Sequence, residues 1–204
     1  MREGSPGQRN PGRGEAALGN RGNCPDRMDH LRILSEIWQE GLEKAPSQLL
    51  YLPYHAYFTT ISFAAYTKAL GVMVRNSLDN GDAAHFCLFL GNKGVDAEKM
   101  KLLTTELKHV PGIVYLDLTE NPLDRKAGKS LAEFIHSQQN LKVLQLNGTH
   151  LSDQGVELVA KALQNHPSMQ SLYMSLKDVG SMGRSALRKL QVKNPNLALF
   201  LTDL

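Results

Sequence analysis

A constant step of 28 residues constrains the fold of this chain more than any other sequence feature. Ile113, Leu141, Met169 and Leu197 begin equivalent segments at this spacing, with no insertion between them. The segment 141–168 shows what is repeated: leucines at strand spacing, a turn-forming loop, and an amphipathic helical run. A unit of this size cannot bury its apolar face alone, so successive units are expected to stack into a solenoid.

The apolar positions within each unit predict how the units stack. Alternate strand residues point to one side of the sheet. Burial of each inward leucine contributes about 1.5–3 kcal/mol of stability, but only when neighbouring repeats cover it. The strands should therefore form one parallel sheet with the helices outside it. Because a helix is wider than a strand, we expect an α/β solenoid with the sheet on the concave face and the helices on the convex face. Gly128, Gly155 and Gly183 fall near the expected loop-to-helix junctions, where tight backbone paths favour glycine.

The first and last units are less regular. Stepping back 28 residues from Ile113 reaches His85, which places a histidine at the first core position. A competing register one residue earlier would put Asn92 at the asparagine position of the repeat, but fewer apolar positions agree. At the other end, residues 197–204 predict a final strand. In it Leu197 and Phe200 face inward, and Ala198, Leu199, Leu201 and Leu204 face outward.

The sequence divides into three parts. Residues 1–26 are rich in Gly, Arg, Asn and Pro, which predicts a disordered tail. Residues 27–83 predict a helical N-terminal cap, with a degenerate repeat as the alternative, and residues 84–204 the repeats. The cap contains an expected helix over 27–44, a stretch of weak periodicity over 47–58, and an expected helix over about 60–78. The first helix would bury Leu31, Leu34, Ile37, Trp38 and Leu42, and the second Phe63, Ala64, Leu70, Val74 and Leu78.

Composition excludes several classes of function. The net charge of +3 is too small to indicate binding of nucleic acid or an acidic membrane surface, and no run approaches the about 18 apolar residues of a membrane span. The N-terminus lacks the apolar stretch of a secretory signal. The two cysteines, Cys24 and Cys87, suit a reducing compartment better than a disulfide. A cytoplasmic location is expected, with the nucleus as the alternative.

No catalytic, cofactor or metal site is expected. Gly128-Lys129-Ser130 resembles the end of a phosphate-binding loop, but Leu123 occupies the position where that motif needs glycine. The histidines show no metal-ligand spacing, so His136, His150 and His166 are interpreted as solvated loop or helix-end residues. The sequence therefore predicts a protein that is not an enzyme and holds no cofactor.

The outward strand positions are the candidate functional surface. Several are aromatic or apolar where solvent would favour charge, and tyrosine is enriched at binding hot spots. The competing interpretation is that such residues decorate a sheet, where aromatic and β-branched side chains are favoured anyway. End-to-end self-association through the C-terminal strand is a further alternative. The predicted partner-binding residues are Tyr115, Asp117, Glu120, Val143, Gln145 and Tyr173.

The repeat resembles the ribonuclease-inhibitor type of leucine-rich repeat, as in the C-terminal halves of NOD-like receptors. The resemblance covers about 85–204 and rests on L-x-x-L-x-L, as in Leu116/Leu118 and Leu144/Leu146. It implies a module that binds a protein partner, of unknown identity, on its concave face. Regulation of a small GTPase and a truncated NOD-like-receptor-type repeat fragment are the alternatives. The asparagine usual at the strand end is present only as Asn121; Lys93, Thr149 and Lys177 stand at its other positions.

Overall fold

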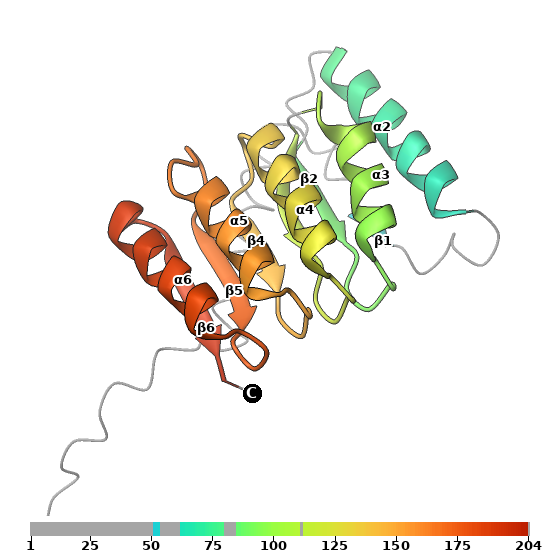
Figure 1. The fold of residues 1–204 in the computed structure, drawn as a ribbon. Coiled ribbons are helices and arrows are strands. Elements are labelled where there is room, and N and C mark those ends of the chain that lie inside the picture. The colour runs from blue at the N-terminus through green and yellow to red at the C-terminus, as the bar shows by residue number, and fades with distance from the viewer. Residues whose placement is uncertain (1–50, 54–61, 80–84, 111, 204) are drawn as a thin grey trace, which may run out of the picture.

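Strands and helices alternate along the chain in the computed structural model, which describes residues 51–53, 62–79, 85–110 and 112–203 (Figure 1). The strands are β1 Tyr51–Pro53, β2 Phe86–Phe89, β3 Ile113–Asp117, β4 Val143–Leu146, β5 Ser171–Ser175 and β6 Ala198–Thr202. The described helices are α2 Phe63–Asp79, α3 Ala97–Leu107, α4 Arg125–Ser137, α5 Asp153–Leu163 and α6 Ser181–Lys193.

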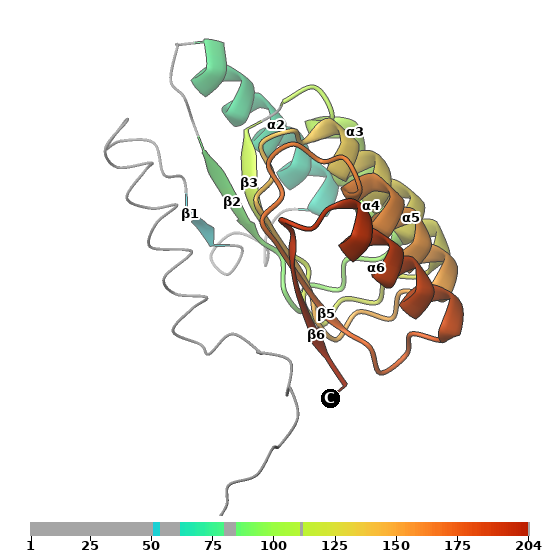
Figure 2. The same ribbon diagram turned by 90° about the vertical axis from the view of Figure 1, so that its left-hand side faces the viewer.

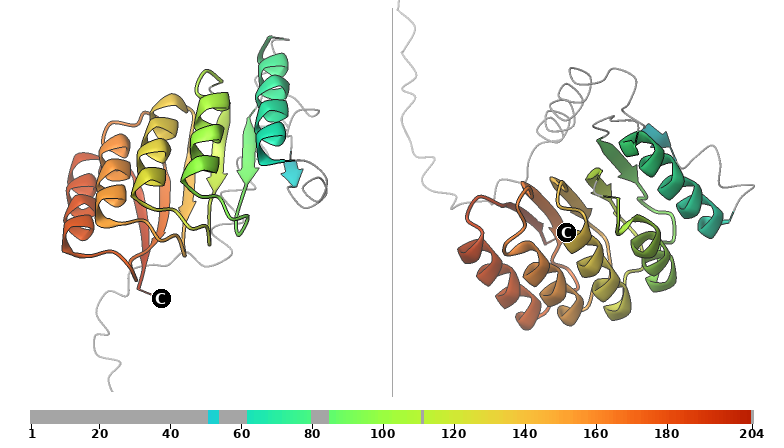
Figure 3. Two further views of the ribbon diagram at one scale, coloured as in Figure 1. Left: turned by 45° about the vertical axis from the view of Figure 1, so that its right-hand side comes forward. Right: turned by 90° about the horizontal axis from the view of Figure 1, so that it is seen from above.

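The strands form one sheet in chain order, β1 to β6, and every neighbouring pair is parallel. The described helices form a second layer on one face of this sheet (Figure 2). Seen from above, the two layers follow an arc with the helices on the outside (Figure 3). The predicted fold class, a leucine-rich-repeat solenoid with a concave sheet and convex helices, is confirmed.

Helix starts repeat with the same period as the strands. Asp96, Asp124 and Ser152 cap α3, α4 and α5, and each side chain accepts a hydrogen bond from the backbone N–H three residues later. Such caps satisfy a backbone donor that the first turn leaves without a partner. Helix α6 departs from this pattern because Gly180 stands at its cap. The Asp153 carboxylate of the preceding repeat accepts the Gly180 N–H instead, at 2.6 Å.

The gap-free register is confirmed for most of β2 and wrong at its first residue. Cys87 pairs with Tyr115 at the expected step of 28. An irregularity between Phe86 and Cys87 lets Phe86 pair with Ile113. Phe86 is fully buried in the main core, whereas His85 is only half-buried. Phe86 therefore takes the first core position. A local irregularity in the strand costs less free energy than burying a polar histidine in an apolar core.

The last strand is also shifted by one residue from the prediction. Ser171 pairs with Ala198 rather than Leu199, and Tyr173 pairs with Phe200. Leu199 and Leu201 pack against the main core, while Phe200 packs on the concave face. The expected orientation of these three residues was wrong. The reason is visible in the sequence, because Leu197, Leu199 and Leu201 alternate strictly. This repeat therefore has one residue fewer between its first two core positions than the preceding repeats have.

The predicted second helix is confirmed as α2. Phe63, Leu70 and Val74 are buried as expected, but Ala64 is exposed. The stretch of weak periodicity contains β1, a strand that the sequence did not predict. The tail at 1–26, the expected helix at 27–44 and the side chain of Leu78 lie outside the described residues.

The repeated glycines serve helix packing. Gly128 and Gly155 lie in the first turns of α4 and α5, near the loop junctions as expected, and a Cβ atom built on Gly128 would come within 2.5 Å of the Gly155 Cα. No side chain fits at that distance without moving one of the helices. The close approach of neighbouring helices, rather than a tight backbone path, therefore requires glycine at Gly128.

Two kinds of polar residue, all buried except the half-buried Asn194, tie successive repeats together. The Asn121 side chain accepts the N–H groups of Lys93 and Val95 and donates to the Leu90 carbonyl. At the opposite end of the strands a second polar position recurs every 28 residues, as Gln138, His166 and Asn194. Each donates to a backbone carbonyl of the preceding repeat, at 2.8, 3.0 and 3.1 Å respectively.

His166 is buried, so its interpretation as a solvated residue was wrong. Its Nδ1 accepts the Met169 N–H at 3.1 Å, which leaves the proton on Nε2 for the Gln138 carbonyl. Loss of hydration on burial lowers the pKa of His166. The imidazole is therefore held neutral as a structural link between two repeats.

Candidate functional site

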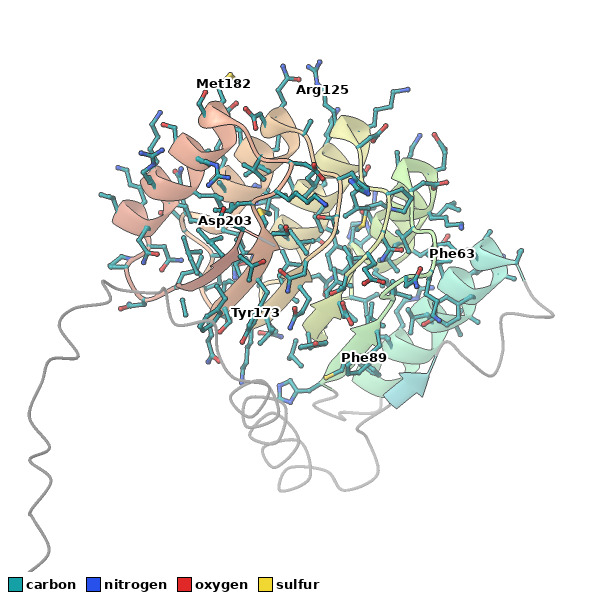
Figure 4. All side chains as sticks on the ribbon, turned by 90° about the horizontal axis from the view of Figure 1, so that it is seen from below. Phe63, Phe89, Arg125, Tyr173, Met182 and Asp203 are labelled. Atoms are coloured by element: carbon teal, nitrogen blue, oxygen red, sulfur yellow. The ribbon has the colours of Figure 1, made fainter. Side chains whose placement is uncertain are left out.

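The concave face of the sheet carries two rows of side chains, set by the strand register. The first row consists of Cys87, Tyr115, Val143, Ser171 and Ala198, and the second of Phe89, Asp117, Gln145, Tyr173 and Phe200. Figure 4 shows Phe89 and Tyr173 on the side of the sheet away from the helices, and Arg125 and Met182 on the helix side. Because strand side chains alternate between faces, these rows cannot contribute to the core between the sheet and the helices.

The apolar members of these rows form a hydrophobic cluster separate from the main core. Its buried members are Cys87, Val114, Tyr115, Val143 and Tyr173, and Phe89 and Phe200 pack against it while half-buried. A leucine-rich repeat needs apolar residues only on the helix side of its sheet. The second cluster is therefore an additional property of this chain.

Two aromatic pairs mark the two ends of the rows. The rings of Phe89 and Tyr115 lie 5.0 Å apart at 37°, and those of Tyr173 and Phe200 lie 4.6 Å apart at 21°. Both geometries are favourable for aromatic contact. Between the pairs, the second row carries polar groups at Asp117 and Gln145. Of these residues, Phe89, Asp117 and Phe200 are half-buried, whereas Tyr115, Gln145 and Tyr173 are buried.

The titratable groups of the first row are uncharged at neutral pH. Burial raises the pKa of the Cys87 thiol to about 12, so it is not an activated nucleophile. Burial, and then the nearby Asp117 carboxylate, raises the pKa of the Tyr115 hydroxyl. Asp117 is held in place because its carboxylate accepts the Thr119 N–H at 2.9 Å.

Five of the six predicted site residues lie together on this face. Tyr115 and Val143 belong to the first row, and Asp117, Gln145 and Tyr173 to the second. Glu120 does not join them, because it lies exposed in the loop after β3 with a φ of 55°. Asn92 and Gly148, one repeat away on either side, also have positive φ, so position 120 is a turn position of the repeat.

Four further residues of the cluster, Cys87, Phe89, Val114 and Phe200, were not predicted as site residues. The prediction favoured tyrosines and charged residues, which left out Cys87, Phe89 and Val114. Phe200 was assigned to the core, and the strict alternation of Leu197, Leu199 and Leu201 was the signal that could have placed it correctly.

Within the described ranges, no group of three or more His, Cys, Asp or Glu side chains could hold a metal ion. His150 and Asp178 approach to 3.1 Å, but both are exposed and simply join neighbouring loops. None of the helices in those ranges has the length and apolar composition needed to cross a membrane.

Comparisons with known proteins support the fold. No family model matches the chain. Over 89 residues, 44% of the chain, it is 28% identical to a Caenorhabditis briggsae protein phosphatase 1 regulatory subunit 37 homolog, and it spans about a tenth of that protein's length. The structure is similar to that of leiomodin-1 actin-binding site 2, with a TM-score of 0.54 and 17% identity, over 65% of this chain and 79% of that one. At this identity the structural likeness shows the solenoid fold alone.

Proposed function

We propose that this protein is a non-enzymatic interaction module that binds a protein partner through the concave face of its solenoid. The observation that carries the proposal is the apolar cluster around Tyr115, Val143 and Tyr173 on the face that the repeat does not need for its core. The half-buried members at its ends, Phe89 and Phe200, share their row with the polar Asp117 and Gln145, and apolar groups rimmed by polar ones are typical of protein-binding surfaces. The similarity to a phosphatase regulatory subunit points to the same general role.

The chemistry of the face suits a partner segment with apolar side chains and a hydrogen-bond donor. Tyrosine and phenylalanine rings provide large contact areas that lose little conformational entropy on binding. The Asp117 carboxylate, half-buried between them, would accept a hydrogen bond from a lysine, an arginine or a backbone N–H.

Affinity capture from a cellular extract tests the proposal. The full chain serves as bait beside an Asp117→Lys/Phe200→Lys variant, and bound proteins are identified by mass spectrometry. Asp117 and Phe200 are only half-buried, so the variant should keep its fold, which far-ultraviolet circular dichroism checks. A matched control, Arg125→Glu/Met182→Lys, places charge changes on the exposed helix side (Figure 4). A partner retained by the control and lost by the concave-face variant is expected; equal capture by all three baits contradicts the site.

A second candidate function is regulation of a protein phosphatase. The 89-residue similarity favours it, although it covers 44% of this chain and 10% of the matched protein. Purified protein phosphatase 1 catalytic subunit is the probe, with its binding to the full chain and its rate of phosphopeptide hydrolysis as readouts. The small-GTPase and receptor-fragment alternatives and end-to-end self-association stay predictions.

A further inference from the structure

Helix α6 is the most strongly basic helix of the described part of the chain. It contains Arg184, Arg188, Lys189 and Lys193 and no acidic residue, whereas each of α2 to α5 contains at least one. Arg184 pairs with the exposed Asp203 at 3.3 Å. Among the described residues, the side chains of Arg188, Lys189 and Lys193 form no ion pair, so their charges remain available to an anionic group.

The same helix also exposes apolar side chains. Met182 is 53% exposed and Val192 80%, the two highest values among the large apolar residues of the described ranges. The two preceding repeats carry polar side chains at the equivalent positions: Gln154 and Lys126 for Met182, and Gln164 and His136 for Val192. The repeat therefore does not require apolar residues at these positions.

Met182 and Val192 lie along a groove between α5 and α6, which are neighbours on the convex side (Figure 3). The groove consists of two adjoining hollows of about 170 and 410 Å³, which share Gln164, Ser185 and Lys189. Met182 lines the first hollow and Val192 the second. The basic residues that line the groove are Lys161, Arg188, Lys189 and Lys193.

One acidic residue, Glu157, also lines the groove. Its carboxylate lies 2.9 Å from the Lys161 Nζ, and the hydrogen bond and the charge of Lys161 lower the pKa of Glu157. The positive charge of Lys189 lowers the same pKa further. Because lysines already compensate Glu157, and basic residues outnumber it, the groove keeps a positive charge.

We propose that this groove binds an acidic amphipathic helix of a protein partner. Carboxylates on the partner helix would face Lys189 and Lys193, and its apolar side chains would cover Met182 and Val192. The groove follows α6 for about 16 Å from Met182 to Lys193, at about 1.5 Å per residue, which matches about three turns of a partner helix. A third helix fits between two packed neighbours because ridges of side chains enter grooves.

Basic residues also attract nucleic acids and anionic membranes, but the surroundings favour a peptide. None of the residues that line the groove is aromatic, so nucleic acid bases would find no side chain to stack on. A helix that lies on a membrane needs a continuous apolar side. Between Met182 and Val192, the exposed residues of α6 are all polar: Ser185, Arg188, Lys189 and Gln191.

Titration of a synthetic peptide with the full chain tests the proposal. The probe is a fluorescent peptide of about 14 leucine and glutamate residues, with the leucines on one helical side, and anisotropy reports binding. Lys189→Glu/Lys193→Glu tests the charges, and Met182→Gln/Val192→Gln introduces the residues that the preceding repeat carries at these positions. Each variant is expected to weaken peptide binding about tenfold or more.

The matched control, Lys126→Glu/Lys129→Glu, reverses two exposed lysines of α4 and should change the affinity less than about threefold. All the substituted side chains are exposed, so the variants should keep their fold, which circular dichroism checks. A second peptide, with glutamine in place of glutamate, is expected to bind at least about tenfold more weakly, because it keeps the apolar side and loses the charge.

Several results would overturn the proposal. They are no binding of the acidic peptide at about 100 µM protein, equal binding by the wild type and both groove variants, equal binding of the two peptides, and equal losses in the groove variants and the α4 control. Sedimentation with vesicles of phosphatidylserine and phosphatidylcholine tests the membrane alternative. Binding to vesicles that the groove variants lose, without binding to the peptide, would overturn the proposal as well.

This inference does not depend on the proposed function. Met182 and Tyr173 lie on opposite sides of the sheet, and the concave rows contribute no residue to the groove (Figure 4). Failure of the peptide to bind would leave the concave face standing, and retention of every partner by the Asp117→Lys/Phe200→Lys bait would leave the groove standing. Because the capture control carries Met182→Lys, a protein lost from that bait alone would be assigned to the groove and not to the concave rows.

Discussion

The two faces of strand β4 are equally buried for different reasons. Leu144, at 0% exposed, packs in the main core beneath the described helices, whereas Val143, at 1%, belongs to the concave cluster. The burial of Leu144 follows from the 28-residue repeat, since any leucine-rich solenoid must fill this position. The burial of Val143 does not follow from the repeat, which needs no apolar residue on the concave face. Apolar residues that the repeat does not require are therefore the best candidates for a functional role.

Shortening a side chain on the helix-facing side of the sheet should reduce stability the most. Leu144→Ala removes a fully buried side chain between two repeats, and the expected loss in the free energy of unfolding is about 2–5 kcal/mol. Urea unfolding followed by circular dichroism measures it. A loss no greater than that of Val143→Ala, expected at about 1–2 kcal/mol from the methyl groups removed, would erase the distinction between the two faces.

Asn121 tests whether polar links hold the helix-side stack together. Asn121→Ala leaves the buried Val95 N–H and the part-buried Lys93 N–H of the preceding repeat without this acceptor, so we expect a loss of about 2–4 kcal/mol. Lys126→Ala, exposed in the same repeat, should change the stability by less than about 0.5 kcal/mol. Similar midpoints for the two variants in urea would refute the role given to Asn121.

Gly128 tests the close packing of the convex layer. Gly128→Ala pushes α4 against the Gly155 backbone of α5, and this overpacking costs about 1–3 kcal/mol despite the better helix propensity of alanine. The neighbouring exposed substitution Lys129→Ala should be nearly neutral. Thermal unfolding distinguishes them, and a Gly128→Ala protein as stable as the wild type would show that the helices can separate freely.

His166 should give the stack a modest pH dependence. Because burial lowers its pKa below the ordinary 6.5, the unfolded chain binds a proton that the folded chain does not, between that lowered pKa and 6.5. Stability from this residue is complete above pH 6.5 and decreases on acidification, by at most about 1.4 kcal/mol per pH unit. His166→Gln, which places the Gln138 side chain type at the equivalent position, should flatten the profile between pH 5 and 7. A profile identical to that of the wild type would assign the dependence elsewhere.

The 28-residue periodicity predicted the solenoid because the leucines of 113–196 define a strand, a loop and a helix three times. The predicted strand register was wrong at Phe86 and between Leu197 and Leu199, where one residue is gained or lost, since a fixed step cannot reveal a local shift in the backbone. The periodicity also missed the three residues of β1, too few to show an alternation. The rows of the site were largely predictable from strand alternation. The burial of His166 and the packing role of Gly128 were not, because they depend on neighbours 28 residues away.

Affinity capture with variants of the two faces tests most directly whether the concave rows bind a partner. The wild type, the Asp117→Lys/Phe200→Lys variant and the Arg125→Glu/Met182→Lys control are compared as baits under the same conditions. We expect a partner that the wild type and the control retain and that the concave-face variant loses. Equal capture by all three baits would contradict the account, because the concave rows would then make no contact with the partner.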